Sequence, residues 1–362
     1  MDPCQAAVDS CIDCGKCGEV CPISMVSDNS TYTPDSKIKL LSKIAAGEAL
    51  EKDEFDTIYL CTRCGVCDDV CPEHIPISDI IQHERELLAE QGREPERTKH
   101  IVSNILEKKN PGGFDNSKRL DWITDDLKLS KDADVGYMAG CWVAFKHPEI
   151  AQATIRVLNS CGIEPRILEE EQCCGLFMID NGHLDEAREY AKNYVNYIES
   201  LGIKQLIVSC PACYGVLKFQ YPKLYRDTKF EVVASIEVFK QLIEEGKLKP
   251  KQIDGTATLK DACPLRHMYD VPREILASMG IEMKEMFDKH TVCCGAPAGV
   301  KPNYPEIADA IGMLHLQKAS ETSGVMVTYC PFCLYHLEGV SQKSGVEVPM
   351  KDIALLLEEG IK

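Results

Sequence analysis

Residues 205–213 read QLIVSCPAC, and residues 325–333 read VMVTYCPFC. Each stretch opens with a short apolar run that is typical of a buried strand and ends in two cysteines, where a helix is expected to start. In parallel α/β folds, ligands gather at the carboxyl ends of the strands, which is where these cysteines fall. The two stretches therefore predict two related α/β units, each with a cysteine-lined site at one edge of its sheet.

The sequence around both stretches repeats in the same order. In the first unit, a β-run over 135–140 leads into a cysteine, and a helix over 150–161, a short run at 166–168, a Cys-Cys-Gly motif and a helix through 197 follow. In the second unit, a strand over 256–260 leads into a cysteine, followed by a helix over 272–279, a Cys-Cys-Gly motif and a helix from 307. Alternation of strands and helices at this spacing predicts parallel βα units. The C-terminal part is expected to be a duplicated, pseudo-twofold α/β pair.

Each long repeat contributes five cysteines. The gap before the Cys-Cys pair is 31 residues in one unit and 29 in the other, and the gap after it is 35 in both. Four thiolates suffice for a cubane cluster, and adjacent cysteines do not easily bind one metal. The surplus suggests a cluster larger or more open than a cube, with a cube plus a spare thiol and a zinc site as alternatives. The first set is Cys141, Cys173, Cys174, Cys210 and Cys213, and the second is Cys263, Cys293, Cys294, Cys330 and Cys333.

A shorter repeat precedes these units. The pattern Cys-x2-Cys-x2-Cys-x3-Cys-Pro begins at position 11 and recurs at position 61. In this pattern three cysteines hold one [4Fe–4S] cube, and the fourth, before proline, holds the other cube of the pair. A zinc site is the alternative, although zinc usually takes two Cys-x2-Cys pairs. The expected ligand sets are Cys11, Cys14, Cys17 and Cys71 for one cube, and Cys61, Cys64, Cys67 and Cys21 for the other.

The N-terminal module is expected to be mostly helical. Residues 35–56 predict one helix, because Ile38, Leu41, Ile44 and Leu50 are spaced for a single face. Residues 78–89 predict another helix, and the polar stretch 91–134, with the turn signal NPGG at 110–113, is typical of a connecting arm. The overall class is α+β, with a two-cluster ferredoxin domain (1–90), a linker (91–134) and two cysteine-rich domains (135–254 and 255–362).

Composition and charge exclude several classes of function. The chain has 362 residues, 20 cysteines and a net charge of −17, which argues against a nucleic-acid partner. Residues 1–20 are polar and rich in cysteine, so no leader is evident, and no run of about 18 apolar residues is present to span a membrane. We therefore expect a cytoplasmic protein whose cysteines bind metal, a disulfide framework being the alternative. Cys4 and Cys161 fall outside both patterns, and no strand is followed by Gly-x-Gly-x-x-Gly, so any flavin or dinucleotide belongs to a partner.

Charge is also uneven along the chain. Residues 1–80 hold fifteen Asp and Glu against six Lys and Arg. An acidic electron-transfer module of this kind is expected to dock on a basic partner face, or its acidity serves only to keep the module in solution.

The duplicated pattern resembles the cysteine-rich CCG domain, and nearly the whole chain resembles the D-subunit family of heterodisulfide reductases. The resemblance rests on the order of the modules and on four local motifs, which are Gly140-Cys141, Cys210-Pro-Ala-Cys213-Tyr214, Asp261-Ala-Cys263-Pro-Leu-Arg266 and Tyr269-Asp-Val-Pro272-Arg273. The chain departs from the family pattern at Ala262, where proline is usual, and at Pro264, where histidine is usual and His267 lies nearby instead. Any role of that family histidine is therefore in doubt here.

The resemblance implies that each five-cysteine set binds a noncubane [4Fe–4S] cluster. It implies reduction of the mixed disulfide of coenzyme M and coenzyme B to two thiols, at the end of methanogenesis. Electrons would come through the two cubes from a redox partner, such as a cytochrome b or a flavin, hydrogenase or formate dehydrogenase protein, which would also provide any membrane attachment. Two open clusters that face one cavity across the pseudo-twofold axis could each capture one sulfur of the substrate.

Two other functional interpretations remain open at this point. The same modules occur in iron–sulfur subunits that relay electrons in hydroxy-acid and glycerol-3-phosphate dehydrogenases and in thiol:fumarate and succinate:quinone reductases, and the chain could also be a pure electron-transfer scaffold. Basic side chains near the first cysteine of each set are candidates for binding an anionic substrate, although an arginine beside a helix start is more often part of a structural ion pair. These candidates are Arg266, His267, Arg273, Lys146 and His147.

Overall fold

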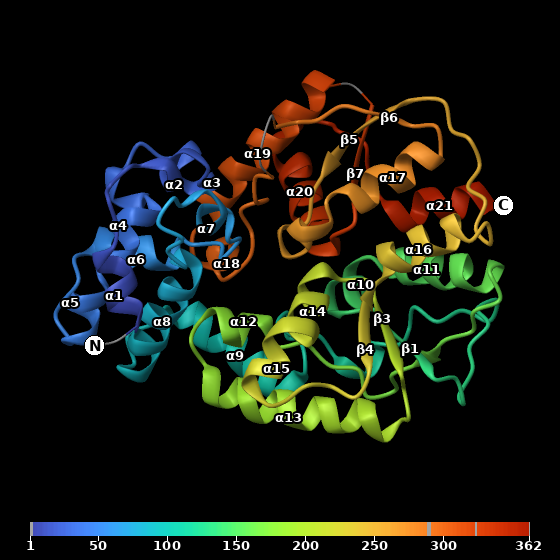
Figure 1. The fold of residues 1–362 in the computed structure, drawn as a ribbon, viewed down its shortest axis with the longest axis horizontal. Helices are drawn as coiled ribbons and strands as arrows, with labels where there is room; N and C mark the ends of the chain where they lie inside the picture. Colours follow the sequence, from blue (N-terminus) through green and yellow to red (C-terminus); the bar gives the residue numbers. More distant parts are fainter. Residues whose placement is uncertain (1–2, 288–290, 323, 362) are drawn as a thin grey trace.

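In the computed structural model the chain forms a helical N-terminal region followed by two α/β units (Figure 1). The structure describes residues 3–287, 291–322 and 324–361. Figure 1 shows the N-terminal region (blue) beside both α/β units, the first in green and yellow and the second in orange and red. The predicted fold, a mostly helical module followed by a duplicated α/β pair, is confirmed.

The N-terminal region is built from short helices around a small apolar core. The predicted single helix over 35–56 is wrong, because the chain turns at Gly47 (φ +70°) and a new helix begins after a capping box formed by Glu51 and Glu54. Ile38 and Ile44 are nevertheless buried, as their spacing suggested. The elements are α1 (Pro3–Asp9), α2 (Lys16–Glu19), α3 (Pro22–Met25), η1 (Ser30–Tyr32), α4 (Pro34–Ile38), α5 (Leu41–Ala45), α6 (Lys52–Tyr59), α7 (Val66–Val70) and α8 (Ile77–Glu90).

The segment expected to be a connecting arm, 91–134, is packed against the first α/β unit. It holds α9 (Glu96–Lys108) and η2 (Asn116–Lys118). Ile105 and Trp122 are buried in the same core as the first sheet, and the Trp122 ring meets that of Tyr137 edge to face, with the ring centroids 5.8 Å apart. The segment therefore stabilises the first unit in addition to connecting it.

The first α/β unit has a parallel four-stranded sheet in the order β2-β1-β3-β4. In register, β1 residue Val135 pairs with Gln205 of β3, which pairs with Glu231 of β4. Helices on both sides cover the apolar faces of these strands. The elements are β1 (Val135–Met138), α10 (Cys141–Lys146), α11 (Pro148–Ser160), β2 (Arg166–Ile167), α12 (Leu176–Asp180), α13 (Leu184–Ser200), β3 (Gln205–Val208), α14 (Pro211–Gly215), η3 (Val216–Gln220), α15 (Tyr221–Leu224), β4 (Glu231–Ala234) and α16 (Ser235–Glu244).

The second α/β unit repeats this order, with strands β6-β5-β7-β8. The two units are packed reciprocally, since the last helix of each contacts the first long helix of the other: α16 packs on α17 and α21 on α11. Two units related by a pseudo-twofold axis are expected to make such reciprocal helix contacts. The elements are β5 (Thr256–Lys260), η4 (Cys263–Met268), α17 (Asp270–Ser278), β6 (Glu282–Met283), α18 (Val300–Asn303), α19 (Pro305–Thr322), β7 (Val325–Thr328), α20 (Pro331–Ser344), β8 (Met350–Asp352) and α21 (Ile353–Ile361).

In both units the cysteines follow the carboxyl ends of the central strands. Cys141 comes after β1 and Cys210 after β3, while Cys263 comes after β5 and Cys330 after β7. The cysteines of each unit therefore lie together at one edge of its sheet, the edge formed by the carboxyl ends of the strands. Within the described part of the chain, none of the helices has the length and apolar content needed to cross a bilayer.

Candidate functional site

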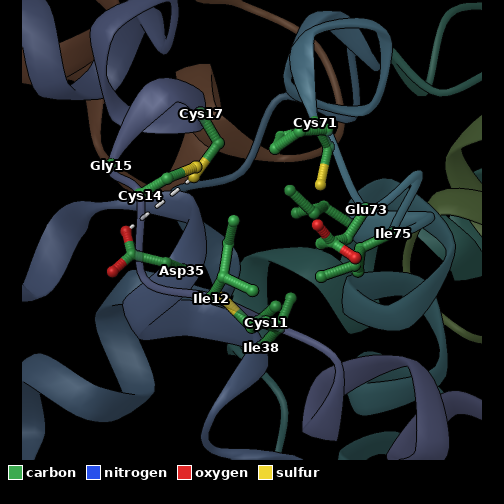
Figure 2. Close-up of a pocket in the computed structure, with 12 residues that line it drawn as sticks. Cys11, Ile12, Cys14, Gly15, Cys17, Asp35, Ile38, Cys71, Glu73 and Ile75 are labelled. Carbon is green, nitrogen blue, oxygen red and sulfur yellow. Dashed lines mark hydrogen bonds between the residues drawn. The ribbon is translucent and has the colours of Figure 1, made fainter.

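The eight cysteines of the N-terminal repeat line two separate cavities. Cys11, Cys14, Cys17 and Cys71 line the first, together with Ile12, Asp35 and Ile75. Figure 2 shows that Cys71 reaches this cavity from the side opposite Cys14 and Cys17. The second cavity is lined by Cys61, Cys64, Cys67 and Cys21. These are the two groupings expected from the sequence, with the fourth cysteine of each run crossing to the other cavity.

Glycines start the two short helices that carry these cysteines. Gly15 (φ +73°) precedes α2, and Gly65 (φ +74°) precedes α7. The left-handed conformation turns the chain sharply between the second and third cysteine of each run, and it favours a residue without Cβ. Space also matters at Gly65, because a Cβ there would lie 2.6 Å from the Nη1 atom of Arg266.

The five cysteines of the first set are buried together. Their side chains are in hydrogen-bonding contact in the order Cys141, Cys173, Cys174, Cys213 and Cys210. Hydrogen bonds from Cys173 and Cys213 lower the pKa of Cys174, which favours the thiolate form that binds metals. The Cys174 carbonyl accepts a hydrogen bond of 2.9 Å from the Tyr221 hydroxyl, which fixes the backbone of the Cys-Cys pair.

The second set is arranged in the same order. Its side chains are in contact in the sequence Cys263, Cys293, Cys294, Cys333 and Cys330. Cys293 also contacts Cys64, which lines the second N-terminal cavity. The second set therefore lies directly beside the N-terminal module.

A buried cation accompanies each set. Arg119, from the segment before β1, places Nη2 3.5 Å from the Cys141 sulfur and Nη1 3.0 Å from Glu171. Burial alone would lower the pKa of Arg119, but Cys141 and Glu171 raise it overall. In the second unit, burial likewise opposes the charge of Lys260, whose pKa is raised overall by Cys333 and Cys263. Buried thiols paired with cations are a donor set that fits an anionic iron–sulfur centre.

We expect the Arg119→Met substitution to destabilise the protein by about 3–5 kcal/mol, because it leaves Glu171 as a buried charge without its partner. The Glu171 carboxylate also accepts hydrogen bonds from the backbone N–H groups of Ala139 (2.9 Å) and Gly140 (3.0 Å), which position the loop before Cys141. The midpoint of urea unfolding, followed by circular dichroism, measures the effect.

The double variant Arg119→Met with Glu171→Gln is the matched control, since it removes both charges and should recover part of the loss. A shift within about 0.5 kcal/mol for the single variant, the range of an ordinary surface substitution, would contradict this role.

A large cavity of about 630 Å³ opens at the first set. All five cysteines of that set line it, and aromatic rings form much of its wall, with Trp142 stacked on Phe332 (centroids 4.8 Å apart) and on Tyr335 (4.7 Å). Four cationic side chains also line it: Arg97, Lys146, Lys301 and Lys343. The arrangement fits an anionic organic molecule held against thiolate-bound metal.

Among the described residues, the cavity that was expected to be lined by both cysteine sets is lined by the cysteines of the first set alone. The second unit reaches the 630 Å³ cavity through the loop 296–299, through α18 and α19 and through Phe332, Tyr335 and Lys343 of α20, and its cysteines are not among the lining residues. Cys294 and Cys333 are buried, as are the cysteines of the first set.

The basic residues proposed from the sequence lie in different places. Lys146 lines the cavity, with Nζ 4.7 Å from the ring centroid of Phe114. His147 is buried next to the cavity-lining helix and contacts Glu149 at 3.1 Å. His267 stacks on Tyr214, with the ring centroids 6.2 Å apart.

The two arginines bind protein groups. Arg266 donates a 2.9 Å hydrogen bond to the Cys64 carbonyl and pairs with Asp69 at 3.0 Å. Arg273 pairs with Asp261 and Glu285 beside a separate cavity of about 290 Å³. Arg97, Lys301 and Lys343, which do reach the large cavity, had no local sequence signal because they come from three segments far apart in the chain.

Arg85 of α8 joins the three parts of the molecule. It is fully buried and donates hydrogen bonds to the carbonyls of Ile58 (2.9 and 3.2 Å) and Cys61 (2.7 Å) in the N-terminal module. The same guanidinium donates to the carbonyls of Asp180 (3.0 Å) in the first unit and Ala298 (2.9 Å) in the second. One buried side chain thus contacts all three parts of the molecule that carry the cysteine groups.

Known proteins match both halves of the chain. A model of a 4Fe-4S dicluster domain matches residues 7–75, and a model of the cysteine-rich CCG domain matches residues 135–218 and 257–338. The dicluster match implies two cubane [4Fe–4S] clusters, and the duplicated match indicates additional iron–sulfur sites at the cysteine-rich domains.

Similar proteins include the D-subunit of dihydromethanophenazine:CoB–CoM heterodisulfide reductase from Methanosarcina barkeri, which is 32% identical over 98% of this chain and 94% of its own length. They also include the B-subunit of a fumarate reductase (CoM/CoB) from Methanothermobacter marburgensis, at 27% identity over 96% of this chain and 71% of that one. An EtfAB:quinone oxidoreductase from Syntrophomonas wolfei is 28% identical over 90% of this chain and 54% of that one. With two domain matches in this order and a relative that aligns over almost its full length, the chain belongs to the D-subunit family of heterodisulfide reductases, a family of iron–sulfur oxidoreductase subunits.

Proposed function

We propose that this chain reduces the mixed disulfide of coenzyme M and coenzyme B to two thiols. The observation that carries the proposal is the 630 Å³ cavity in which all five cysteines of the first set meet four cationic side chains. We further propose that each five-cysteine set holds a noncubane [4Fe–4S] cluster and that the N-terminal sets hold the two cubes. When bound, the clusters would supply single electrons and an iron atom able to bind a substrate sulfur.

The cavity wall suits both ends of such a substrate. Sulfonate, phosphate and carboxylate groups are anionic, and Lys146, Lys343 and Arg97 offer ammonium and guanidinium groups for them. The apolar chains between these groups and the disulfide would pack on Trp142 and Phe332. The substrate sulfurs would then lie at the deepest part of the wall, formed by the cysteines.

The contacts also suggest an order of electron transfer. Cys14 is exposed and Ile12 is 60% exposed, so the first N-terminal cavity is the one that a redox partner can approach. The second N-terminal cavity contacts the second set through Cys64 and Cys293. We therefore propose that a cube held by Cys11, Cys14, Cys17 and Cys71 would accept electrons from the partner, and that groups held by the second N-terminal cavity and by the second set would connect it to the first set, where the substrate binds. The donor would be a cytochrome b or a flavin, hydrogenase or formate dehydrogenase protein, which would hold this cytoplasmic chain at a membrane where one is involved.

We expect Lys146→Gln to raise KM for the disulfide about fivefold with little change in kcat, because an exposed ion pair contributes up to about 1 kcal/mol to binding. The difference between the variant and the wild type should shrink as salt is added, since the charges at the cavity mouth are screened. Lys192→Gln, an exposed lysine on α13 that pairs with Glu189, is the matched control and should leave KM unchanged. An unchanged KM for Lys146→Gln at low salt would remove Lys146 from the binding surface.

Electron relay is the second candidate function. It is favoured by the enclosed position of the second set beside Cys64, which is the place of a relay centre, and by the range of oxidoreductases among the relatives. In that role the chain would pass electrons between a flavoprotein and a quinone or thiol without acting on a disulfide itself.

One assay separates the two candidates. Anaerobically purified protein with its full iron complement is mixed with reduced viologen and the mixed disulfide, and thiol release is measured. Two thiols released per disulfide consumed, with two viologens oxidised, would support catalysis. An intact iron complement that accepts electrons from viologen without thiol release would favour the relay function.

A further inference from the structure

Lys301 differs from the other cations of the cavity in how it is held. It lies on α18, just after the loop that follows Cys293-Cys294-Gly295, and it lines the 630 Å³ cavity together with the first set. Its Nζ is 2.8 Å from Nδ1 of His336 and 5.6 Å from the ring centroid of Tyr335. The ammonium is therefore held at the cavity wall by a neutral acceptor.

The protonation state of His336 follows from the contact that its second ring nitrogen, Nε2, makes. This side chain is fully buried on α20, and its Nε2 lies 3.0 Å from the Ala308 carbonyl oxygen. A carbonyl oxygen can only accept a hydrogen bond, so Nε2 carries the proton and Nδ1 presents a lone pair to Lys301. Burial and the charge of Lys301 lower the pKa of His336 to about 4, which agrees with a neutral ring.

Burial and the charged groups around Lys301 together lower the pKa of its ammonium group. Burial lowers the pKa of Lys301, Asp309 on α19 and Cys294 raise it, and Lys343 on α20 lowers it, with a net shift downward. The carboxylate of Asp309 is bound by Lys343 at 2.8 Å, so its negative charge is largely shared with that lysine. Arg97 on α9 adds another positive charge to the same wall. Lys301 is thus a stronger acid than an exposed lysine.

We propose that the Lys301 ammonium is the proton donor to a product thiolate in the 630 Å³ cavity. The inference rests on the proposed disulfide reduction. In that reaction the disulfide would take up one electron from each of two molecules of an external one-electron reductant, a transfer that bound iron–sulfur centres would supply, so that the S–S bond breaks and two thiolates form. Lys301 Nζ gives its proton to one thiolate, which becomes a thiol and leaves, and the resulting amine takes a proton from solvent at the cavity mouth. The second thiolate leaves as such and takes its proton from solvent, so that two electrons and two protons yield two thiols. His336 Nδ1 orients the ammonium and does not itself change protonation state.

Two substitutions separate proton donation from charge. Lys301→Met removes both and should lower kcat about 10²–10⁴-fold, the usual contribution of a positioned acid. Lys301→Arg keeps the charge but does not release a proton near neutral pH, so kcat should also fall about 10²-fold while KM stays close to the wild-type value. The wild-type kcat should decline as pH rises through the pKa of Lys301, because the ammonium is the active form, and both variants should lose this limb of the profile.

A second readout does not depend on turnover. Competitive acetylation of the iron-loaded protein over a range of pH, followed by mass spectrometry, gives the pKa of individual lysines. The pKa of Lys301 should lie below the ordinary value of a lysine, and saturating disulfide should protect Lys301 but not Lys318, an exposed lysine on α19 paired with Glu321. Lys318→Met is the matched control and should retain wild-type kcat.

The possible outcomes are distinct. If the wild type releases thiols and Lys301→Arg retains kcat and its pH profile, the proton-donor role is overturned and the proposed function stands. Titration of Lys301 at the ordinary value of a lysine would likewise overturn the role. If the iron-loaded wild type releases no thiol, the proposed function fails and this inference fails with it.

Discussion

Cys174→Ala protein is expected to lose disulfide reduction by at least about 100-fold, since even groups that only support metal ligands account for 10–100-fold effects. Cys174 lies in the middle of the first set, between Cys173 and Cys213, and lines the cavity. The eight cysteines around the two N-terminal cavities do not include it, so the EPR signals of the cubes should remain. Viologen-driven thiol release and EPR of the reduced protein measure the two effects separately.

Cys161→Ala is the matched control for this substitution. Cys161 is partly exposed at the end of α11, and its sulfur contacts the Ser160 hydroxyl at 3.7 Å instead of the first set. The Cys161→Ala protein should retain its disulfide-reducing activity. Cys294→Ala should lose activity as Cys174→Ala does, because we place the second set between the cubes and the substrate. Full activity in either the Cys174 or the Cys294 variant would refute a mechanism that uses both sets.

Arg85→Met is expected to have the largest effect on stability. Five hydrogen bonds from one buried guanidinium are lost, each of the charged kind that contributes about 1.5–3 kcal/mol, and although such effects are not additive the loss should exceed about 4 kcal/mol. Four backbone carbonyls would be left without this donor in three parts of the fold. The expected consequence is a loss of docking between the N-terminal module and the α/β units, seen as a lower thermal midpoint and as slower electron transfer from the cubes to the cysteine-rich sites.

Arg85→Lys keeps the charge without the fork of five donors, so it should be intermediate between Arg85→Met and the wild type. Arg188→Met removes an exposed arginine on α13 that pairs only at the surface with Asp185, and it should shift the midpoint little. A thermal midpoint for Arg85→Met equal to that of Arg188→Met would contradict the role of Arg85 as the side chain that joins the three parts.

Local sequence patterns predicted the elements that carry the cysteines. The apolar runs before Cys210 and Cys330 form β3 and β7, and the predicted helix over 78–89 is α8 (Ile77–Glu90). These predictions succeeded because strand ends, helix periodicity and cysteine spacing are properties of short segments. The short run at 166–168 forms the edge strand β2 (Arg166–Ile167), whereas the strands β4, β6 and β8 were not predicted.

The features that depend on distant contacts were not predicted. Arg119 sits in a segment whose composition is that of a polar arm, and its contact with Cys141 appears only when that segment packs on the first sheet. Lys301 and His336 are 35 residues apart and meet because α18 and α20 both pack on α19. In the sequence, His336 follows the Cys-Pro-Phe-Cys motif on a predicted helix. A histidine in such a place indicates by itself only a residue of the core.

The most direct test of the account is an anomalous difference map at the iron absorption edge from anaerobically grown crystals soaked with the mixed disulfide. The account predicts about 16 iron atoms per chain in four groups, two at the N-terminal cavities and one at each five-cysteine set. It also predicts disulfide or thiol density in the 630 Å³ cavity next to Cys174 and Lys301. Zinc or no metal at the five-cysteine sets, or substrate density away from the first set, would contradict it.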